Sequence, residues 1–118
     1  MDATHLIPLI DRTYSFSLQI ISLITDNVKV IPSVLSNQLL RAGTSVGANI
    51  TEAKAAASRK EFANFYRIAL KSNNETIYWL RLLKDSRMVS CKIADTILQE
   101  AEEIGRIIGT SINKLRDS

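Results

Sequence analysis

The chain has 118 residues, of which 46% are hydrophobic, and its formal charge is +3 at pH 7. This length suits one domain with a single core, and the apolar fraction excludes a disordered chain. Four glycines and two prolines are too few turn-forming residues for a many-stranded β fold, so the composition favours a few long helices. The mildly basic balance is compatible with nucleic acid but does not require it, and charge alone favours an ordinary, slightly basic protein surface.

Cys91 is the only cysteine and His5 is the only histidine. No internal disulfide or cysteine-based zinc site can form, which is typical of the reducing cytoplasm. We interpret Cys91 as a small core residue, and a His5–Cys91 dyad is the weaker alternative. The N-terminus has no basic residue before its apolar stretch, so it does not resemble a signal peptide. No apolar run reaches the ~18 residues of a membrane span.

The first helix is predicted over residues 4–27, with Thr4 as a possible cap and Pro8 in the first turn. Asp11, Arg12 and Gln19 are predicted to face solvent. Its apolar face, read from the helical spacing, comprises Leu6, Ile10, Ser17, Ile21, Ile24 and Val28, widened by Leu9, Phe16, Ile20 and Leu23.

The second helix is predicted over residues 33–57, capped by Ser33 or Ser36 after Pro32. Its core face comprises Leu35, Leu39, Ala42, Val46, Ile50, Ala53 and Ala57. Two glycine pairs share a four-residue spacing, one on this helix and one on the last, namely Gly43 with Gly47 and Gly105 with Gly109. Because glycine destabilises a helix by ~1 kcal/mol relative to alanine, the pairs suggest close packing of the second helix against the fourth. Chance spacing is the alternative.

The third helix is predicted over residues 59–87 and the fourth over 91–116. Ser58 and Glu61 have the spacing of a capping box before the third, and Ser90 can cap the fourth. The fourth helix is expected to bury Ile93, Ile97, Ala101, Ile104, Ile108, Ile112 and Leu115, and to expose Asp95, Glu102, Arg106 and Asn113. Four helices with short connections predict an all-α fold, an antiparallel up-down four-helix bundle formed as a single domain over residues 1–118.

A polar ladder runs along the edge of the apolar face of the second helix, comprising Gln38, Arg41, Ser45, Asn49 and Glu52. The third helix supplies possible counterparts in Ser72 and Glu75. Charged groups at such positions are usually paired, so we expect Arg41 or Asn49 to meet Glu75, within one chain or between two. A two-metal bundle site would need Glu-x-x-His pairs on facing helices, and His5 belongs to no such pair, so we expect no metal.

A basic stripe is predicted on the outer surface of the third helix, comprising Lys60, Arg67, Lys71, Asn74, Tyr78 and Arg81. These residues fall within about 80° of one another on a helical projection. The stripe carries almost no interleaved acids, so it is suited to attract phosphates, and Tyr78 could stack on an unpaired base. An ordinary solvated helix face is the alternative.

The third helix is also apolar over roughly 200°, more than the ~100° stripe that one bundle needs. This surplus predicts a second contact surface, most simply with another copy of the chain. The residues that we expect at this interface are the aromatic side chains Phe62, Phe65, Tyr66 and Trp79. Deep placement between two neighbours in one bundle is the competing explanation.

Two linked motifs resemble those of the four-helix bundle family of bacterial 23S rRNA intervening-sequence proteins. They are R-A-x-x-S-V-x-A-N-I-x-E from Arg41 to Glu52 and S-R-K-E-F-x-x-F-x-x-I-A-L-x-S-x-x-E from Ser58 to Glu75. The signature positions are Arg41, Ser45, Asn49, Glu52, Phe62, Phe65, Ser72 and Glu75. Many members have glycine after the signature glutamate, where Ala53 stands here, so the second helix is expected to continue further.

The resemblance implies a bundle that assembles into a ring, commonly a pentamer. It also implies a positively charged surface, which in a relative, the accessory variability protein of diversity-generating retroelements, engages nucleic acid and the reverse transcriptase. The expected function is therefore a cytoplasmic, non-enzymatic homo-oligomer that binds RNA or DNA. A scaffold or adaptor that binds another protein is the alternative. Since no Gly-rich phosphate loop, metal-ligand cluster or credible nucleophile–base pair is present, we expect neither catalysis nor a cofactor.

Overall fold

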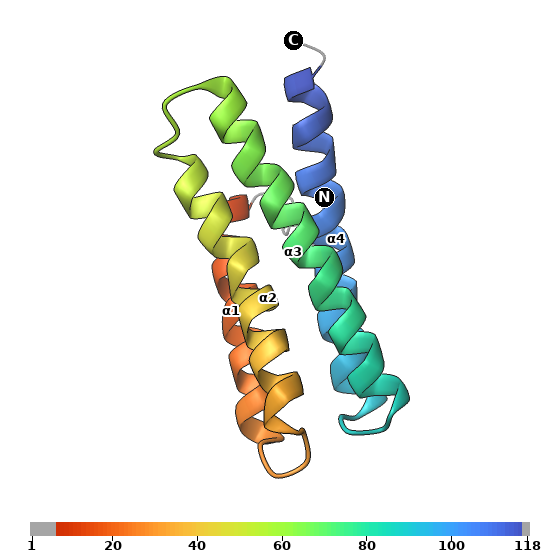
Figure 1. Cartoon of the computed structure of the whole chain (residues 1–118). Helices are drawn as coiled ribbons and strands as arrows, with labels where there is room; N and C mark the ends of the chain where they lie inside the picture. Colours follow the sequence, from red (N-terminus) through yellow and green to blue (C-terminus); the bar gives the residue numbers. More distant parts are fainter. Residues whose placement is uncertain (1–6, 117–118) are drawn as a thin grey trace.

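The computed structural model describes residues 7–116, and within them it contains four α-helices and no strand (Figure 1). They are α1 (Leu9–Asp26), α2 (Ser33–Ala53), α3 (Arg59–Asp85) and α4 (Cys91–Arg116). Consecutive helices run antiparallel through short connections, which confirms the predicted all-α up-down bundle. None of these helices is long and apolar enough to span a membrane.

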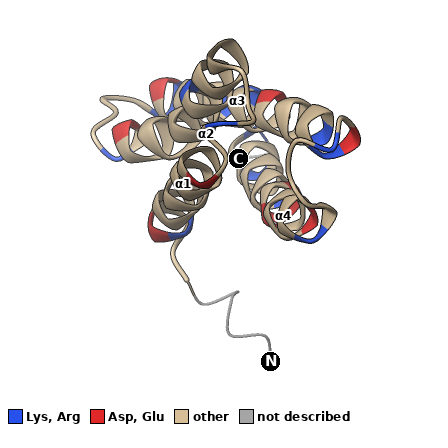
Figure 2. Ribbon diagram, turned by 90° about the horizontal axis from the view of Figure 1, so that it is seen from below, with Lys and Arg blue, Asp and Glu red and all other residues tan. Residues whose placement is uncertain are grey.

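The bundle consists of two hairpins that separate towards one end. α2 packs extensively against both α1 and α3, and α3 against α4, whereas α1 and α4 touch only sparsely. In Figure 1 the α1–α2 and α3–α4 connections lie apart at the same end of the molecule. Figure 2, viewed from that end, shows α1 and α4 on one side of the bundle and diverging from each other. This divergence opens the surface between them to solvent.

The core contains most of the apolar positions predicted for α2, α3 and α4, and on α1 it contains Phe16, Ile20 and Leu23, which were predicted only to widen the apolar face. The largest fully buried apolar side chains are Phe16, Ile20, Leu39, Val46, Leu80, Leu83, Ile104 and Ile108. The prediction was wrong for Ile93, which is 50% exposed because α4 diverges from α1 at this end. It was also wrong for Ile21 and Val28, which are exposed because α1 turns its Phe16–Ile20–Leu23 face inward.

Two predicted caps are confirmed. The Ser58 hydroxyl accepts the Glu61 amide at 3.0 Å, while the Glu61 carboxylate reaches back to the Ala57 amide at 3.2 Å. The Ser90 hydroxyl accepts the Ile93 amide at 3.3 Å. The predicted cap of α2 was wrong, because Pro32 occupies that position and no side chain bonds the helix end. The proposed Thr4 cap lies outside the described residues, as do Leu6 and His5.

α2 ends at Ala53 and does not continue to residue 57, so the expectation of a longer helix was wrong and Ala57 is exposed. The amides of Lys54, Ala55 and Ala56 each bond to the carbonyl three residues earlier, which tightens the last turn and redirects the chain. α3 ends at Asp85, two residues before the predicted end, where Arg87 adopts a left-handed conformation with φ 63°. The backbone N–H of Arg87 donates a hydrogen bond to the Lys84 carbonyl, and that of Met88 donates to the Leu83 carbonyl. The two hydrogen bonds close a Schellman motif there.

The glycine pairs do not bring α2 and α4 together, so that prediction was wrong. A Cβ atom at Gly43 would lie 2.9 Å from the Ile20 side chain, and one at Gly47 would lie 3.2 Å from the Thr13 carbonyl oxygen, both on α1. A Cβ atom at Gly105 would lie 3.0 Å from the Asn73 amide nitrogen on α3. In an up-down bundle α2 and α4 are diagonal neighbours, so Gly43, Gly47 and Gly105 meet an adjacent helix instead, and a Cβ atom at Gly109 would meet open space.

Arg12 is buried, contrary to the expectation that it faces solvent. Its side chain is 5% exposed and bonds to Glu100 at 2.8 and 2.9 Å and to Glu103 at 3.0 Å. These contacts raise the pKa of Arg12 against the opposing effect of burial. The long arginine therefore bridges α1 to α4 where the two helices share little other contact. The prediction for Cys91 was also wrong. We expected a buried core residue, but Cys91 is exposed at the start of α4.

Candidate nucleic-acid interface and the polar seam beside it

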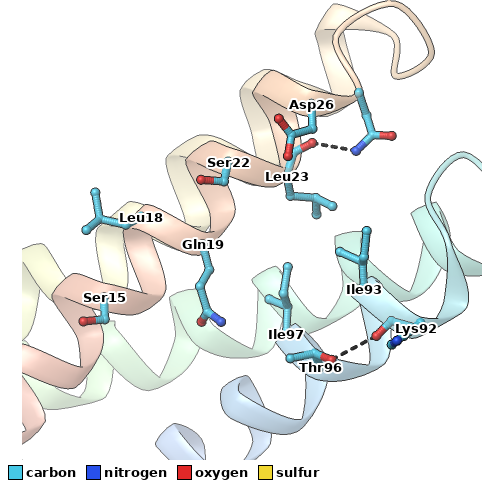
Figure 3. A pocket seen from close by; sticks show the side chains of 11 residues that line it. Ser15, Leu18, Gln19, Ser22, Leu23, Asp26, Lys92, Ile93, Thr96 and Ile97 are labelled. Carbon is cyan, nitrogen blue, oxygen red and sulfur yellow. Dashed lines mark hydrogen bonds between the residues drawn. The ribbon is translucent and has the colours of Figure 1, made fainter.

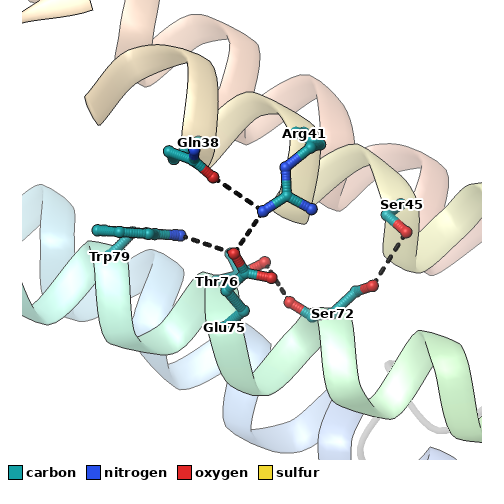
Figure 4. A network of polar contacts seen from close by, with 7 residues as sticks. All are labelled: Gln38, Arg41, Ser45, Ser72, Glu75, Thr76 and Trp79. Atoms are coloured by element: carbon teal, nitrogen blue, oxygen red, sulfur yellow. Dashed lines mark hydrogen bonds and ion pairs between the residues drawn. The ribbon is translucent and has the colours of Figure 1, made fainter. Parts of the chain in front are cut away.

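The predicted ladder forms a hydrogen-bonded seam between α2 and α3 (Figure 4). The Arg41 guanidinium forms an ion pair with Glu75 and donates a hydrogen bond to the Gln38 side chain at 2.8 Å. The Trp79 indole donates to the same Glu75 oxygen at 3.3 Å. The predicted contact between Arg41 and Glu75 is confirmed, and it lies within one chain.

The seam continues through hydroxyl groups along the two helices. The Ser72 hydroxyl donates to the Ser45 hydroxyl at 2.9 Å, and Asn49 donates to that hydroxyl at 3.0 Å and to the Ser45 carbonyl at 2.8 Å. Asn49 is thus held by its own helix and does not reach Glu75. Glu52 is exposed near the end of α2.

The seam sets the register of α2 against α3, and its side chains do not form a catalytic or metal-binding site. Arg41 is 59% exposed, so its ion pair contributes at most ~1 kcal/mol. A nucleophile would need a neighbouring base, and the hydroxyls of Ser45 and Ser72 bond to each other and to an amide. Across residues 7–116 no three histidine, cysteine or carboxylate side chains gather in a way that could hold a metal ion.

The four aromatic residues predicted at an oligomer interface are all half-buried within a single chain. Phe62 stacks on Tyr66 with ring centroids 4.6 Å apart, and both Tyr66 and Trp79 pack against the core. Burial raises the pKa of the Tyr66 hydroxyl. Phe65 is likewise half-buried. Packing inside the bundle therefore accounts for part of the wide apolar arc of α3.

The basic stripe lies on one solvent-exposed face of α3, because its six members project away from the buried side of the helix. All of them are exposed, namely Lys60, Arg67, Lys71, Asn74, Tyr78 and Arg81. Tyr78 also contacts Trp79 edge-on, with ring centroids 5.2 Å apart. The stripe therefore runs over most of the length of α3.

The neighbours of the stripe divide it into two parts with different charge. Near the start of α3, Lys60 and Arg67 line a hollow of about 370 Å³ with Arg59 and Arg116, over Ala63 and Leu115, and no carboxylate from residues 7–116 lines it. Arg116 was missed by sequence reasoning. The signal was available, because antiparallel packing places the basic end of α4 beside the start of α3.

At the other end of the stripe, basic and acidic side chains lie side by side. Arg81 shares a second hollow between α3 and α4 with the carboxylates of Asp85, Asp95 and Glu102. Lys84 lies there too and bonds to Asp95 at 2.6 Å, a contact that raises the pKa of the lysine. Near the start of α3, one carboxylate, that of Glu61, shares a neighbouring hollow with Lys60 and Arg67. The stripe is therefore more strongly positive between Lys60 and Lys71 than around Arg81.

The family model for the 23S rRNA-intervening sequence protein matches residues 8–110, which is nearly all of the described chain. The chain belongs to this family. A solved structure from Bacteroides thetaiotaomicron VPI-5482, a protein with unknown function from the S23 ribosomal protein family, is 36% identical to this intervening-sequence protein. The similarity covers 89% of this chain and 98% of that chain, with a TM-score of 0.82. Among curated proteins, no relative matches the chain.

Proposed function

We propose that this protein is a non-enzymatic homo-oligomer that binds structured nucleic acid through the basic part of the α3 stripe. The observation that carries the proposal is the exposed row Lys60, Arg67 and Lys71, extended by Arg116 from α4. The family resemblance, which implies a ring and a positively charged surface, supports the same proposal.

The geometry suits a phosphate backbone better than individual bases. Lys60 and Arg67 are seven residues apart, or about 10 Å along the helix axis, and Lys71 follows about 6 Å further on. Such a row can contact successive phosphates without reading sequence, so binding depends on the shape and charge of the nucleic acid. Three phosphate contacts would make the logarithm of the association constant with a duplex fall by about 2.7 for each tenfold rise in salt.

The double variant Arg67→Glu with Lys71→Glu tests this assignment. We expect it to abolish retention of a structured RNA on immobilised protein at low salt, because two phosphate-binding cations become repulsive anions. The matched control is Arg106→Glu with Lys29→Glu, which makes the same charge change at exposed positions outside the α3 row. Equal retention by the wild type and the α3 variant, or equal losses in both variants, would remove the α3 row from the mechanism.

Arg81→Glu supplies an internal comparison. Since Arg81 already lies among three carboxylates, we expect this change to reduce retention less than Arg67→Glu alone. A larger loss at Arg81 would place the contact at the other end of α3.

A protein-binding scaffold is the second candidate, and a different observation favours it. An open groove of about 460 Å³ lies between the diverging ends of α1 and α4 (Figure 3). Its apolar lining comprises Leu18, Leu23, Ile93 and Ile97. A wild-type oligomer that retains neither RNA nor DNA at low salt would support the scaffold over the nucleic-acid binder.

A further inference from the structure

The basic hollow at the start of α3 is lined by cations from two helices. Lys60 and Arg67 of α3 and Arg116 of α4 surround it, and the apolar side chains Ala63 and Leu115 lie among them. Figure 1 shows the first turns of α3 and the last turns of α4 at the same end of the bundle. Tertiary packing therefore adds a third cation to the two that α3 provides by its own periodicity.

These three cations are available to a ligand. Lys60, Arg67 and Arg116 are exposed, and none of them forms an ion pair with a carboxylate of residues 7–116. Glu61 lines the adjoining hollow, but its carboxylate accepts a hydrogen bond from the Ala57 amide at 3.2 Å, which holds it at the connection before α3. Like charges gathered at one place repel one another, and a bound anion relieves that repulsion.

The charge of the hollow distinguishes a terminal phosphate from an internal one. An internal phosphodiester carries one negative charge, whereas a terminal phosphomonoester carries about −1.5 to −2 at pH 7 and has three strong acceptor oxygens. Arginine binds such oxygens in pairs through its planar fork. Two arginines and a lysine around one hollow therefore match a terminal phosphate, while the single cation of Lys71 further along α3 matches a phosphodiester.

The shape of the hollow agrees with this ligand. Its volume of about 370 Å³ lies in the range of small-ligand sites, roughly 300–1,000 Å³, so it has room for a sugar beside the phosphate. Ala63 lies between Lys60 and Arg67 on α3, and Leu115 precedes Arg116 on α4. These apolar side chains offer a surface for the carbon atoms of the sugar, which the exposed polar positions further along the stripe do not.

We infer that the basic hollow, lined by Lys60, Arg67 and Arg116, binds a terminal phosphate of a nucleic acid, so that the protein holds a strand by its end. The inference rests on the proposed function and names the part of the nucleic acid that the site recognises. From the hollow the strand continues past Lys71, which lies about 6 Å beyond Arg67 along the helix axis, and on towards Tyr78. There the exposed ring can stack on an unpaired base.

The test compares one RNA hairpin in three forms, with a 5′-phosphate, with a 3′-phosphate, or with hydroxyl groups at both ends. A fluorophore in the hairpin loop reports binding to the full-length protein by anisotropy at low salt. We expect a phosphate on at least one end to lower the dissociation constant about tenfold, because it gains charge-assisted hydrogen bonds that a hydroxyl cannot make. The end that gives the gain is the end that occupies the hollow.

Three single variants separate the hollow from the rest of the row. Arg116→Gln should remove most of the tenfold preference while changing the binding of the hydroxyl form little. Lys71→Gln lies outside the hollow, so it should weaken all three forms by the same factor and keep the preference. Arg106→Gln is the matched control, because it removes the same charge at another exposed position of α4. Circular dichroism checks that each variant is folded.

Equal binding of the three forms by the wild type would overturn the inference and leave the proposed nucleic-acid binding standing. A preference that survives Arg116→Gln as fully as Arg106→Gln would also overturn it, since the added phosphate would then act through general charge alone. If the wild type binds none of the forms, both the inference and the proposed nucleic-acid binding fail.

Discussion

Arginine plays opposite parts at two positions of this protein, and exposure accounts for the difference. Arg12 is 5% exposed and satisfies two carboxylates from α4, whereas Arg41 is 59% exposed and pairs with Glu75 alone. Burying an arginine requires a large desolvation free energy. Once it is paired, however, its removal destabilises the fold, because the partner carboxylates lose their cation. An exposed pair is screened by water and contributes little.

We predict that Arg12→Ala lowers the free energy of unfolding by about 3 kcal/mol, since it leaves Glu100 and Glu103 near each other without a cation. Arg41→Ala should lower it by no more than ~1 kcal/mol. Urea denaturation of both variants checks the comparison. Equal effects would show that the α1–α4 bridge contributes no more than a surface ion pair.

Within the elements, the four glycines differ in what surrounds them. Gly47 of α2 lies against the backbone of α1, where a Cβ atom would come within 3.2 Å of the Thr13 carbonyl oxygen. Gly109 of α4 has open space where its Cβ atom would be. The first glycine therefore permits close helix packing, and the second carries only the entropic penalty of glycine in a helix.

Alanine substitution should separate these two cases. We expect Gly109→Ala to raise the free energy of unfolding by up to ~1 kcal/mol, the difference in helix propensity between the two residues. Gly47→Ala should instead be destabilising, because the carbonyl it would meet belongs to a packed backbone that cannot move easily. Thermal denaturation of the two variants provides the measurement, and stabilisation by Gly47→Ala would contradict the close packing of α1 on α2.

At the scale of the whole molecule, the separation of the two hairpins leaves apolar surface that one chain does not cover. Ile93 was expected in the core and is instead half exposed beside the groove. If copies of the chain associate, the melting temperature should rise with protein concentration, because the oligomer is linked to the folded state by mass action. Scanning calorimetry over a hundredfold concentration range checks this. A constant melting temperature in a reversible transition would argue against self-association.

Much of the fold follows from local patterns. The apolar periodicity located the core faces of α2 and α4 but that of α1 only in part, since Ile21 and Val28 are exposed. The Ser58–Glu61 and Ser90 signals located two helix starts. Ion pairing between Arg41 and Glu75 was predictable because a charge at the edge of an apolar face needs a partner nearby. Element ends were less predictable. α2 stops at Ala53 although residues 54–57 are mostly alanine, because the chain must turn there into α3.

The amino-acid sequence by itself determined the class of the fold, the order of its helices, the polar seam and the exposed basic row of α3, because each depends on spacing along one helix or between neighbouring helices. Only the tertiary structure decided that Arg12 is buried, that three of the glycines meet adjacent helices, that Arg81 lies among acids, and that α1 and α4 diverge. Those features depend on which helices approach one another and at what angle. Helical periodicity shows which face of a helix is apolar, but the neighbour that covers that face is set by the packing of the whole bundle.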